Sequence, residues 1–283
     1  MNLTKVLALS SWVATGHVGL SAAAPVLQAL GHRVTQLPTV ILSNHPGFAH
    51  VSGAQVPPDQ LDGMVQAMAA NGWLGDHDAL LTGYLPSPAH VELACQLIDR
   101  LRRLNPQIRV ITDPILGDDA TGLYIAEAAA TATRDRLVPL ADTLTPNAFE
   151  LGWLTGQATD TLPQAIAAAR QLIAAGRTGR VLVTSPPLAE GRTGVLAVTA
   201  ACATLCCNPA RQDVPHGTGD AFSAMIAAGL APGQALGHLD ALIAVSTGAP
   251  HLRIAETAGQ WTGAAAVAPS SLKDLTEPAG HGL

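Results

Sequence analysis

The fold is decided by the stretch Val214-Pro215-His216-Gly217-Thr218-Gly219-Asp220, which runs directly into the apolar segment 221–228. Apolar residues recur at helical spacing through that segment, so we expect a buried helix to begin near Gly219 or Asp220. Glycines on both sides of Thr218 allow a tight turn in which no side chain covers the backbone amides. Free N–H groups at a helix start, together with the helix dipole, favour an anion such as a phosphate. The stretch therefore predicts an anion-binding turn at the start of a buried helix.

The carboxylate of Asp220 has two interpretations. Beside a bound phosphate it would be repelled unless it takes up a proton there, which suggests phosphoryl transfer to a hydroxyl with Asp220 as the base. Alternatively, Asp220 is the N-cap of an ordinary helix. The stretch is neither a dinucleotide fingerprint, because Phe222 stands where that motif needs a glycine, nor a Walker loop, because no Gly-Lys-Ser/Thr occurs.

Composition limits the classes of function. The 283 residues are 48% hydrophobic but only 3% aromatic, which predicts a core of Ala, Leu and Val. The formal charge is −6 and the two lysines, Lys5 and Lys273, are far apart, so no nucleic-acid or anionic-membrane surface is expected. Neither a leader pattern nor a bilayer-length apolar run is found, and we expect a cytoplasmic protein. Cys206 and Cys207, being adjacent, should point to opposite faces of a strand.

Strand patterns alternate with helix patterns along the chain. This predicts an α/β fold with one mostly parallel sheet and helices on both faces, in a single domain over residues 1–261. Residues 262–283 read as a loosely ordered tail. We expect strands at residues 5–11, 34–37, 39–42, 79–82, 109–112, 142–144 and 181–183, an antiparallel pair at 194–199 and 203–207, and helices at 21–30, 58–68, 88–104, 125–136, 162–175 and 232–247.

Polar residues stand just beyond the carboxyl ends of several predicted strands, or at the helix start that follows. In an open α/β sheet this edge is where ligands bind, so together they predict a site there. The residues are Ser11, Tyr84, Asp113, Asn147 with Glu150, Thr184 with Ser185, and Asp220.

Three of these residues have the oxygen ligands that Mg²⁺ prefers, usually through its waters: Asp113, Asn147 and Glu150. The Asn147-x-x-Glu150 spacing puts two of them on one side of a first helical turn. The same spacing also fits a capping pair, in which Glu150 complements the helix dipole. No phosphate-binding lysine is present, so phosphate charge would be balanced by metal and backbone dipoles.

These motifs, in this order and spacing, resemble the pyridoxal kinases of the ribokinase-like superfamily over residues 5 to 250. Gly-Thr-Gly-Asp and Asn-x-x-Glu are the signatures of the superfamily, and Thr-Val-x-x-Ser-Asn-His and Gly-Tyr-Leu are similar to the pyridoxal kinases. The motifs are Ser11 with residues 16–19, residues 39–45, 83–85, 112–114, 117–118, 145–150 and 183–185, and Gly217-Thr218-Gly219-Asp220.

The resemblance implies a three-layer α/β/α fold and ATP-dependent phosphorylation of the 5′-hydroxymethyl group of pyridoxal, and of pyridoxine or pyridoxamine. It implies a homodimer, Mg²⁺ and a monovalent cation such as K⁺. Asp220 matches the base, with Gly217, Thr218 and Gly219 as the anion hole, and Asp113 and Glu150 match the acids that hold magnesium, with Asn147 nearby. Thr145, Thr184 and Ser185 match nucleotide-side or cation-side positions, and Ser11, Val18, His45, Pro46, Gly47 and Tyr84 match the substrate side.

The chain departs from the family pattern at Trp12, Leu20, Pro46 and Pro86, where the family more often has a small or polar residue, an asparagine, a hydroxyl and a glycine. These positions bear on vitamer preference and affinity. Two other functions stay open. One is a kinase of hydroxymethylpyrimidine or a sugar, although the motifs of those enzymes are absent here. The other is a protein that binds B6 vitamers without turnover.

Overall fold

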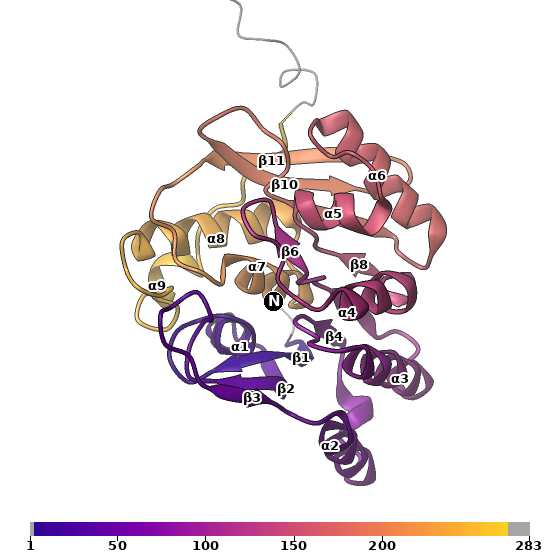
Figure 1. The fold of residues 1–283 in the computed structure, drawn as a ribbon. Coiled ribbons are helices and arrows are strands. Elements are labelled where there is room, and N and C mark those ends of the chain that lie inside the picture. Colours follow the sequence, from indigo (N-terminus) through magenta and orange to yellow (C-terminus); the bar gives the residue numbers. More distant parts are fainter. Residues whose placement is uncertain (1–2, 271–283) are drawn as a thin grey trace, which may run out of the picture.

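The computed structural model describes residues 3–270 and arranges them around a nine-stranded sheet with helices on both faces (Figure 1). The strand order is β11-β10-β9-β8-β5-β4-β1-β2-β3, and the six strands from β9 to β2 are parallel. The predicted α/β/α architecture is confirmed. The strands are β1 (Lys5–Val13), β2 (Arg33–Leu42), β3 (Gly53–Gln55), β4 (Ala79–Thr82), β5 (Arg109–Thr112), β8 (Thr143–Leu144), β9 (Arg180–Thr184), β10 (Arg192–Val198) and β11 (Ala203–Pro209); β6 (Gly117–Asp118) and β7 (Gly122–Leu123) form a separate hairpin.

The three layers follow from alternation along the central strands. In β1, Val6 and Ala8 belong to the core on one face, whereas Leu7 and Leu9 belong to the core on the other. Because successive side chains of a strand point to opposite faces, a strand that is apolar throughout must be covered on both. Cys206 and Cys207 of β11 divide between the two faces in the predicted way.

The helices separate into two groups. One face of the sheet is covered by the first and last long helices of the chain, and the other by those between them (Figure 1). The first group is α1 (Leu20–Ala29), α7 (Thr218–Ala227), α8 (Pro232–Ser246) and the short α9 (Ala258–Trp261). The second is α2 (Pro58–Ala70), α3 (Pro88–Leu104), α4 (Glu127–Ala132), α5 (Ala148–Thr155) and α6 (Leu162–Ala175).

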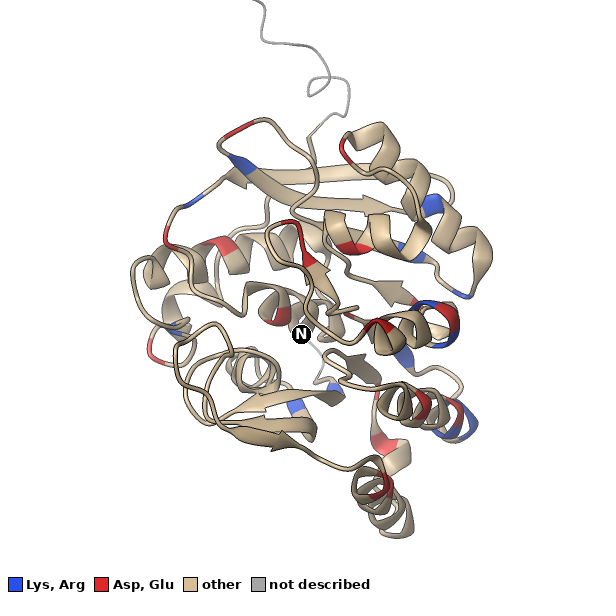
Figure 2. Ribbon diagram, viewed as in Figure 1, with Lys and Arg blue, Asp and Glu red and all other residues tan. Residues whose placement is uncertain are grey.

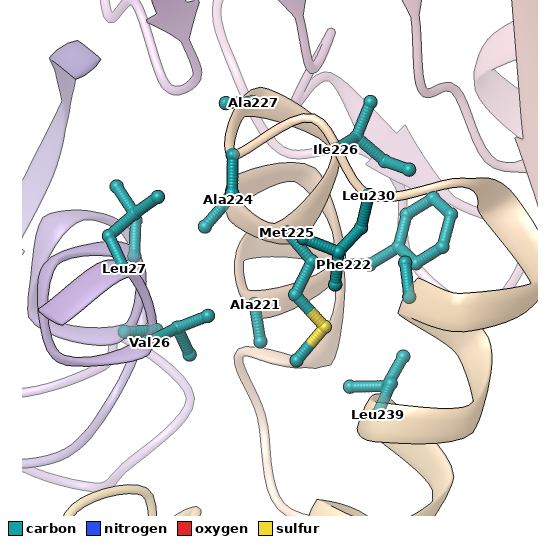
Figure 3. Close-up of a cluster of buried hydrophobic side chains, with 14 of the residues drawn as sticks. Val26, Leu27, Ala221, Phe222, Ala224, Met225, Ile226, Ala227, Leu230 and Leu239 are labelled. Atoms are coloured by element: carbon teal, nitrogen blue, oxygen red, sulfur yellow. The ribbon is translucent and has the colours of Figure 1, made fainter. Parts of the chain in front are cut away.

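Helix α7 is buried along most of its length, as its sequence predicts. Phe222, Met225 and Ile226 are at most 1% exposed, and they pack toward α8 and the sheet (Figure 3). Val26 and Leu27 of α1 lie beside the same helix. Burying a side chain of this size stabilises a fold by about 1.5–3 kcal/mol, so α7 is fixed firmly and its N-terminus has a defined place.

The structure differs from the expected elements in two strands. Strand β1, expected over residues 5–11, continues to Val13 across a break in register between Ser10 and Trp12. Residues 34–37 and 39–42 form one strand, β2, rather than two. Pro38 is tolerated within it because β3 pairs only with Val40–Leu42, so Pro38 has no neighbour on that side.

Two further differences concern helices and the chain end. The helix expected at 125–136 is α4 followed by a wider π-type turn over Thr133–Leu137. Part of the predicted tail packs on α8 and β11: Val267 N–H donates to Gly233 O, and Ser270 N–H donates to Leu205 O. Residues 271–283 of that predicted tail lie outside the described residues. Over residues 3–270, no helix is both long enough and apolar enough to cross a membrane.

Candidate active site

The carboxyl ends of the parallel strands bring together polar residues from three neighbouring strands. Asp113 follows β5 directly and is 8% exposed, and Thr145 follows β8 and is 2% exposed. Thr145 N–H donates to Thr112 O, which sets the two strand ends side by side. Thr184 ends β9, and its N–H donates to Pro146 O. Parallel pairing thus gathers at one edge the residues that the sequence predicts there.

Helix α7 begins with the anion-binding turn. Gly217 is the N-cap, in the left-handed region with φ of 97°, and no side chain caps the helix. Asp220 is therefore three residues inside the helix, and the N-cap interpretation is wrong. The amide groups of the first turn have no side-chain acceptor, and a ligand anion can fill that role.

The start of α1 meets the start of α7. Gly19 is the N-cap of α1, with φ of 55°, and its backbone acts to lower the pKa of the Asp220 carboxyl group. A Cβ on Gly19 would lie 2.2 Å from both the carbonyl oxygen and the Oγ of Ser11, so only glycine fits against Ser11. Ser11 lies within β1 at its break in register, and not beyond the strand end as expected. Two helix N-termini therefore face one point, which strengthens its attraction for an anion.

Glu150 is 3% exposed and is fixed by two backbone donors. Its Oε1 accepts from Leu116 N–H at 2.9 Å, and its Oε2 accepts from Asn147 N–H at 2.9 Å. Asn147 is the N-cap of α5, and its side chain accepts from Glu150 N–H, so the predicted capping box is present. Asn147 Nδ2 also donates to Gly117 O, which ties the β6–β7 hairpin to the site (β6 in Figure 1).

Burial raises the pKa values of the three carboxyl groups, and repulsion by a neighbouring carboxylate adds to this for Asp113 and Glu150. The pKa of Asp113 is raised by burial and then by the charge of Asp220, and that of Glu150 by burial and then by the charge of Asp113. Burial raises the pKa of Asp220 to about 6, although the backbone of Gly19 acts in the opposite direction. A group that is ionised only above about pH 6 is poised to act as a base at neutral pH.

No protein cation neutralises this cluster. Among the described residues, none of the ion pairs involves Asp113, Glu150 or Asp220, and lysine and arginine lie toward the periphery of the molecule (Figure 2). Residues 3–270 contain no group of three or more His, Cys, Asp or Glu side chains that could enclose a metal ion. Mg²⁺ keeps several waters and needs only one or two carboxylates, so the buried pair Asp113 and Glu150 fits its donor set.

Three of the predicted nucleotide-side and substrate-side residues are held by backbone hydrogen bonds. Ser185 is exposed, with φ of 46°, and its N–H donates to Gly194 O. Tyr84 N–H donates to Ser10 Oγ at 3.0 Å, which fixes Tyr84 against β1. Val18 accepts from Ser21 N–H at the entrance to α1.

The loop between β2 and β3 carries His45, Pro46 and Gly47. The His45 ring stacks on the His216 ring with 4.1 Å between centroids and 20° between planes. Because His216 directly precedes Gly217, this stack brings the loop to the anion-binding turn. It places His45 next to the candidate site, whereas Pro46 and Gly47 are exposed.

Sequence reasoning missed several residues of the site. Ser223 Oγ donates to Asp113 Oδ2 at 2.8 Å, and Ser10, Asp113, Asp220 and Ser223 line one small cavity of about 10 Å³. Ser223 follows Asp220 by three residues, a spacing that puts both on one helix face and could have revealed it. Tyr124 N–H donates to Leu116 O, and Leu116 N–H in turn donates to Glu150, so Tyr124 is linked to the acidic cluster through the backbone.

Comparison with known proteins agrees with this fold. The family model described as phosphomethylpyrimidine kinase matches residues 14–239. The pyridoxine/pyridoxal/pyridoxamine kinase of Bordetella avium is 42% identical over 240 residues, which are 83% of this chain and 80% of the relative. The pyridoxal kinase PdxY of Leifsonia xyli is 37% identical over 227 residues, or 79% and 80% of the two chains. The pyridoxal kinase of Leishmania donovani, solved with ADP and pyridoxamine, superposes with a TM-score of 0.87 at 26% identity, covering 95% and 100% of the chains.

The three-layer fold and the Gly-Thr-Gly-Asp helix start define a small-molecule kinase of the phosphomethylpyrimidine kinase family, and the chain belongs to it. Within that family it is a member of the pyridoxal kinases, as the resemblance in the sequence indicates.

Proposed function

We propose that this chain transfers the γ-phosphoryl group of ATP to the 5′-hydroxymethyl group of pyridoxal, pyridoxine or pyridoxamine. The observation that carries the proposal is the position of Asp220, a carboxylate inside the first turn of α7, beside the uncapped amides of Gly217, Thr218 and Gly219. A base and an anion hole on consecutive residues are what phosphoryl transfer to an alcohol requires.

In this function each group has a distinct task. Asp220 accepts the proton of the hydroxymethyl group as its oxygen forms the new bond to phosphorus and the bond to the ADP oxygen breaks. The amides of residues 217–219 donate to the oxygens of the transferring group, and the dipoles of α7 and α1 favour its charge. We assign Thr145, Thr184, Ser185 and Asn147 to the nucleotide side of the site.

Asp113 and Glu150 would hold Mg²⁺, whose chemistry is to neutralise phosphate charge during transfer. Their burial without a protein cation supports this role. We include a monovalent cation such as K⁺ near Thr145 and Thr184. On the substrate side, Ser11, Val18, His45, Pro46, Gly47 and Tyr84 would surround the pyridine ring.

We also propose a homodimer that uses the region after residue 37. Ile41, Phe48 and Val51, on β2 and the loop that follows, are 46%, 45% and 46% exposed. Such a set of large apolar side chains on one segment is typical of a surface that is covered in the assembly. Sedimentation of the purified protein tests this directly.

The deciding experiment incubates the purified protein with Mg-ATP and, in parallel, pyridoxal, pyridoxine, pyridoxamine, hydroxymethylpyrimidine or ribose. ADP release with formation of the 5′-phosphate of a B6 vitamer supports the proposal. If only hydroxymethylpyrimidine is phosphorylated, the chain is a hydroxymethylpyrimidine kinase and the proposal is wrong. Binding of pyridoxal without ADP release would identify a binding protein.

A further inference from the structure

We propose that Ser223 is a positioning residue, which holds Asp113 in place relative to the helix that carries Asp220. The inference rests on the proposed kinase function, and it concerns a residue outside the anion-binding turn and the predicted ligand set. Ser223 lies within α7 and is 1% exposed, so its side chain is shielded from bulk solvent.

The contacts of Ser223 define a chain of three buried groups. Its Oγ donates to Asp113 Oδ2 at 2.8 Å, and the Oγ1 of Thr145 lies 2.9 Å from the same Oγ. A hydroxyl has one hydrogen, and Ser223 donates its hydrogen to the Asp113 carboxylate. Thr145 is therefore the donor in the contact between Thr145 and Ser223. The order is therefore Thr145 O–H to Ser223 O–H to Asp113, with each member at most 8% exposed.

This chain links three elements, because it joins the ends of the paired strands β5 and β8 to helix α7. Asp113 follows β5, Thr145 follows β8, and Ser223 is one helical turn after Asp220 in α7. Helix α7 itself is fixed by Phe222, Met225 and Ile226 (Figure 3). The hydrogen bond to Asp113 therefore transfers the rigidity of the α7 core to a side chain on a different element.

The direction of the hydrogen bond matters for the site. It occupies Oδ2 of Asp113, and no hydrogen bond among the described residues involves Oδ1. Asp113 and Asp220 repel each other, since the charge of Asp220 raises the pKa of Asp113. Without Ser223, the Asp113 side chain is free to rotate away from Asp220, and both oxygens change their orientation.

The test is a double-mutant cycle between Ser223 and Asp113. If Ser223 acts only through Asp113, then Ser223→Ala lowers kcat about 10-fold to 100-fold in the wild-type background and less than about 2-fold in the Asp113→Ala background. KM for pyridoxal should change little, because Ser223 touches no ligand. Ser223→Thr, which keeps the hydroxyl, should recover most of the lost kcat.

Thr178→Val is the matched control, because Thr178 is 2% exposed, donates to Ala141 O, and stands before β9 at the opposite edge of the sheet. It removes a buried hydroxyl and should lower the melting temperature without lowering kcat. Equal losses from Ser223→Ala in both backgrounds would overturn the proposal, as would a kcat for Ser223→Ala equal to that of Thr178→Val.

Should Asp113→Ala turn over too slowly for a cycle, Mn²⁺ binding to the ADP-loaded protein, followed by electron paramagnetic resonance, provides the comparison. Weaker Mn²⁺ binding in Ser223→Ala than in Thr178→Val supports the proposal, and equal binding contradicts it. If the wild-type protein phosphorylates no B6 vitamer, the proposed function is wrong. That result can be distinguished from failure of the Ser223 proposal, in which the wild type is active and the variants behave alike.

Discussion

The backbone of Gly217 packs directly against the carbonyl oxygen of His17, so closely that a Cβ at Gly217 would lie 1.8 Å from that oxygen. His17 belongs to the loop between β1 and α1, and Gly217 is the N-cap of α7. The contact therefore sets the distance between the two helix starts that face the candidate site. Position 217 requires glycine for two reasons: the close approach of the His17 carbonyl oxygen leaves no room for a Cβ, and φ is 97°.

Gly217→Ala should lower both stability and activity, because the methyl group forces one of the two loops to move. Gly219→Ala is the matched control, since a Cβ there meets nothing within 4 Å and its backbone is not in the left-handed region. We expect Gly219→Ala to melt within about 2 °C of the wild type, whereas Gly217→Ala melts several degrees lower. Equal melting temperatures in calorimetry would show that the loops yield easily.

Asp220→Asn should lower kcat at least about 100-fold while ATP still binds, because removal of a general base costs about that much. In the wild type, kcat should rise with pH through about 6, since the pKa of Asp220 is raised to about 6 and the base must be ionised. The measurements are initial rates between pH 5 and 8 and a nucleotide titration of the variant. Unchanged turnover in Asp220→Asn would mean that another group accepts the proton.

The same carboxylate should reduce stability as the pH rises. The pKa of Asp220 is higher in the folded protein than its ordinary value of 3.8, so the folded state binds the proton more tightly than the unfolded state does. Its stabilising contribution is present below about pH 4 and is lost as the pH rises through about 6. Asp220→Asn should therefore be more stable than the wild type at pH 8, by about 1–3 kcal/mol, with a smaller advantage at pH 4.5.

Asp135→Asn provides the control for this pH dependence. Asp135 is exposed, and its hydrogen bond from Arg134 lowers its pKa. Its effect on stability therefore has the opposite dependence on pH to that of Asp220. This variant should be slightly less stable than the wild type at pH 8. The measurement is the free energy of unfolding in urea of the wild type, Asp220→Asn and Asp135→Asn at pH 4.5 and pH 8. An advantage of Asp220→Asn that shrinks from pH 4.5 to pH 8 would contradict the assigned pKa shift.

The sequence predicts elements well where local signals are strong. Helices α3 and α6 have a Ser or Thr cap with a proline at the first or second helical position and carry a clear apolar stripe, and both match their expected ranges. Strand β1 was expected to end at Ser11, because Ser-Ser reads as the start of a turn. The bulge at that point and the pairing with β2 depend on long-range contacts that a local pattern does not contain.

The same distinction applies to the site. Asp113, Glu150 and Asp220 are predictable because each follows a strand or opens a helix in a parallel sheet. Ser10 has no such local signal and becomes recognisable only when the folded chain places it against Tyr84, whereas the only sequence signal for Ser223 is its three-residue spacing from Asp220. Glu150 shows that two interpretations need not exclude each other: its capping box is real, and its carboxylate still lies beside Asp113.

The stacked rings of His45 and His216 are the contact that joins the β2–β3 loop to the anion-binding turn. Over the described residues, no hydrogen bond or ion pair links residues 44–51 to residues 209–217, so the loop's approach to that turn depends on this stack. His216→Ala should therefore raise KM for pyridoxal several-fold and change kcat little. His50→Ala is the control, because His50 is an exposed residue of the same loop.

The stack should also make substrate binding sensitive to pH. Gly47 N–H donates to His45 Nδ1 at 3.1 Å, which requires that nitrogen to be unprotonated. Burial and then His216 lower the pKa of His45, so it stays neutral at pH 7. As the pH falls, protonation of His45 removes the acceptor for Gly47 N–H and puts a charge in the stack, so KM for pyridoxal should rise in the wild type. His216→Ala should show a weaker rise, measured as KM against pH; an identical rise in both proteins would assign the effect to another group.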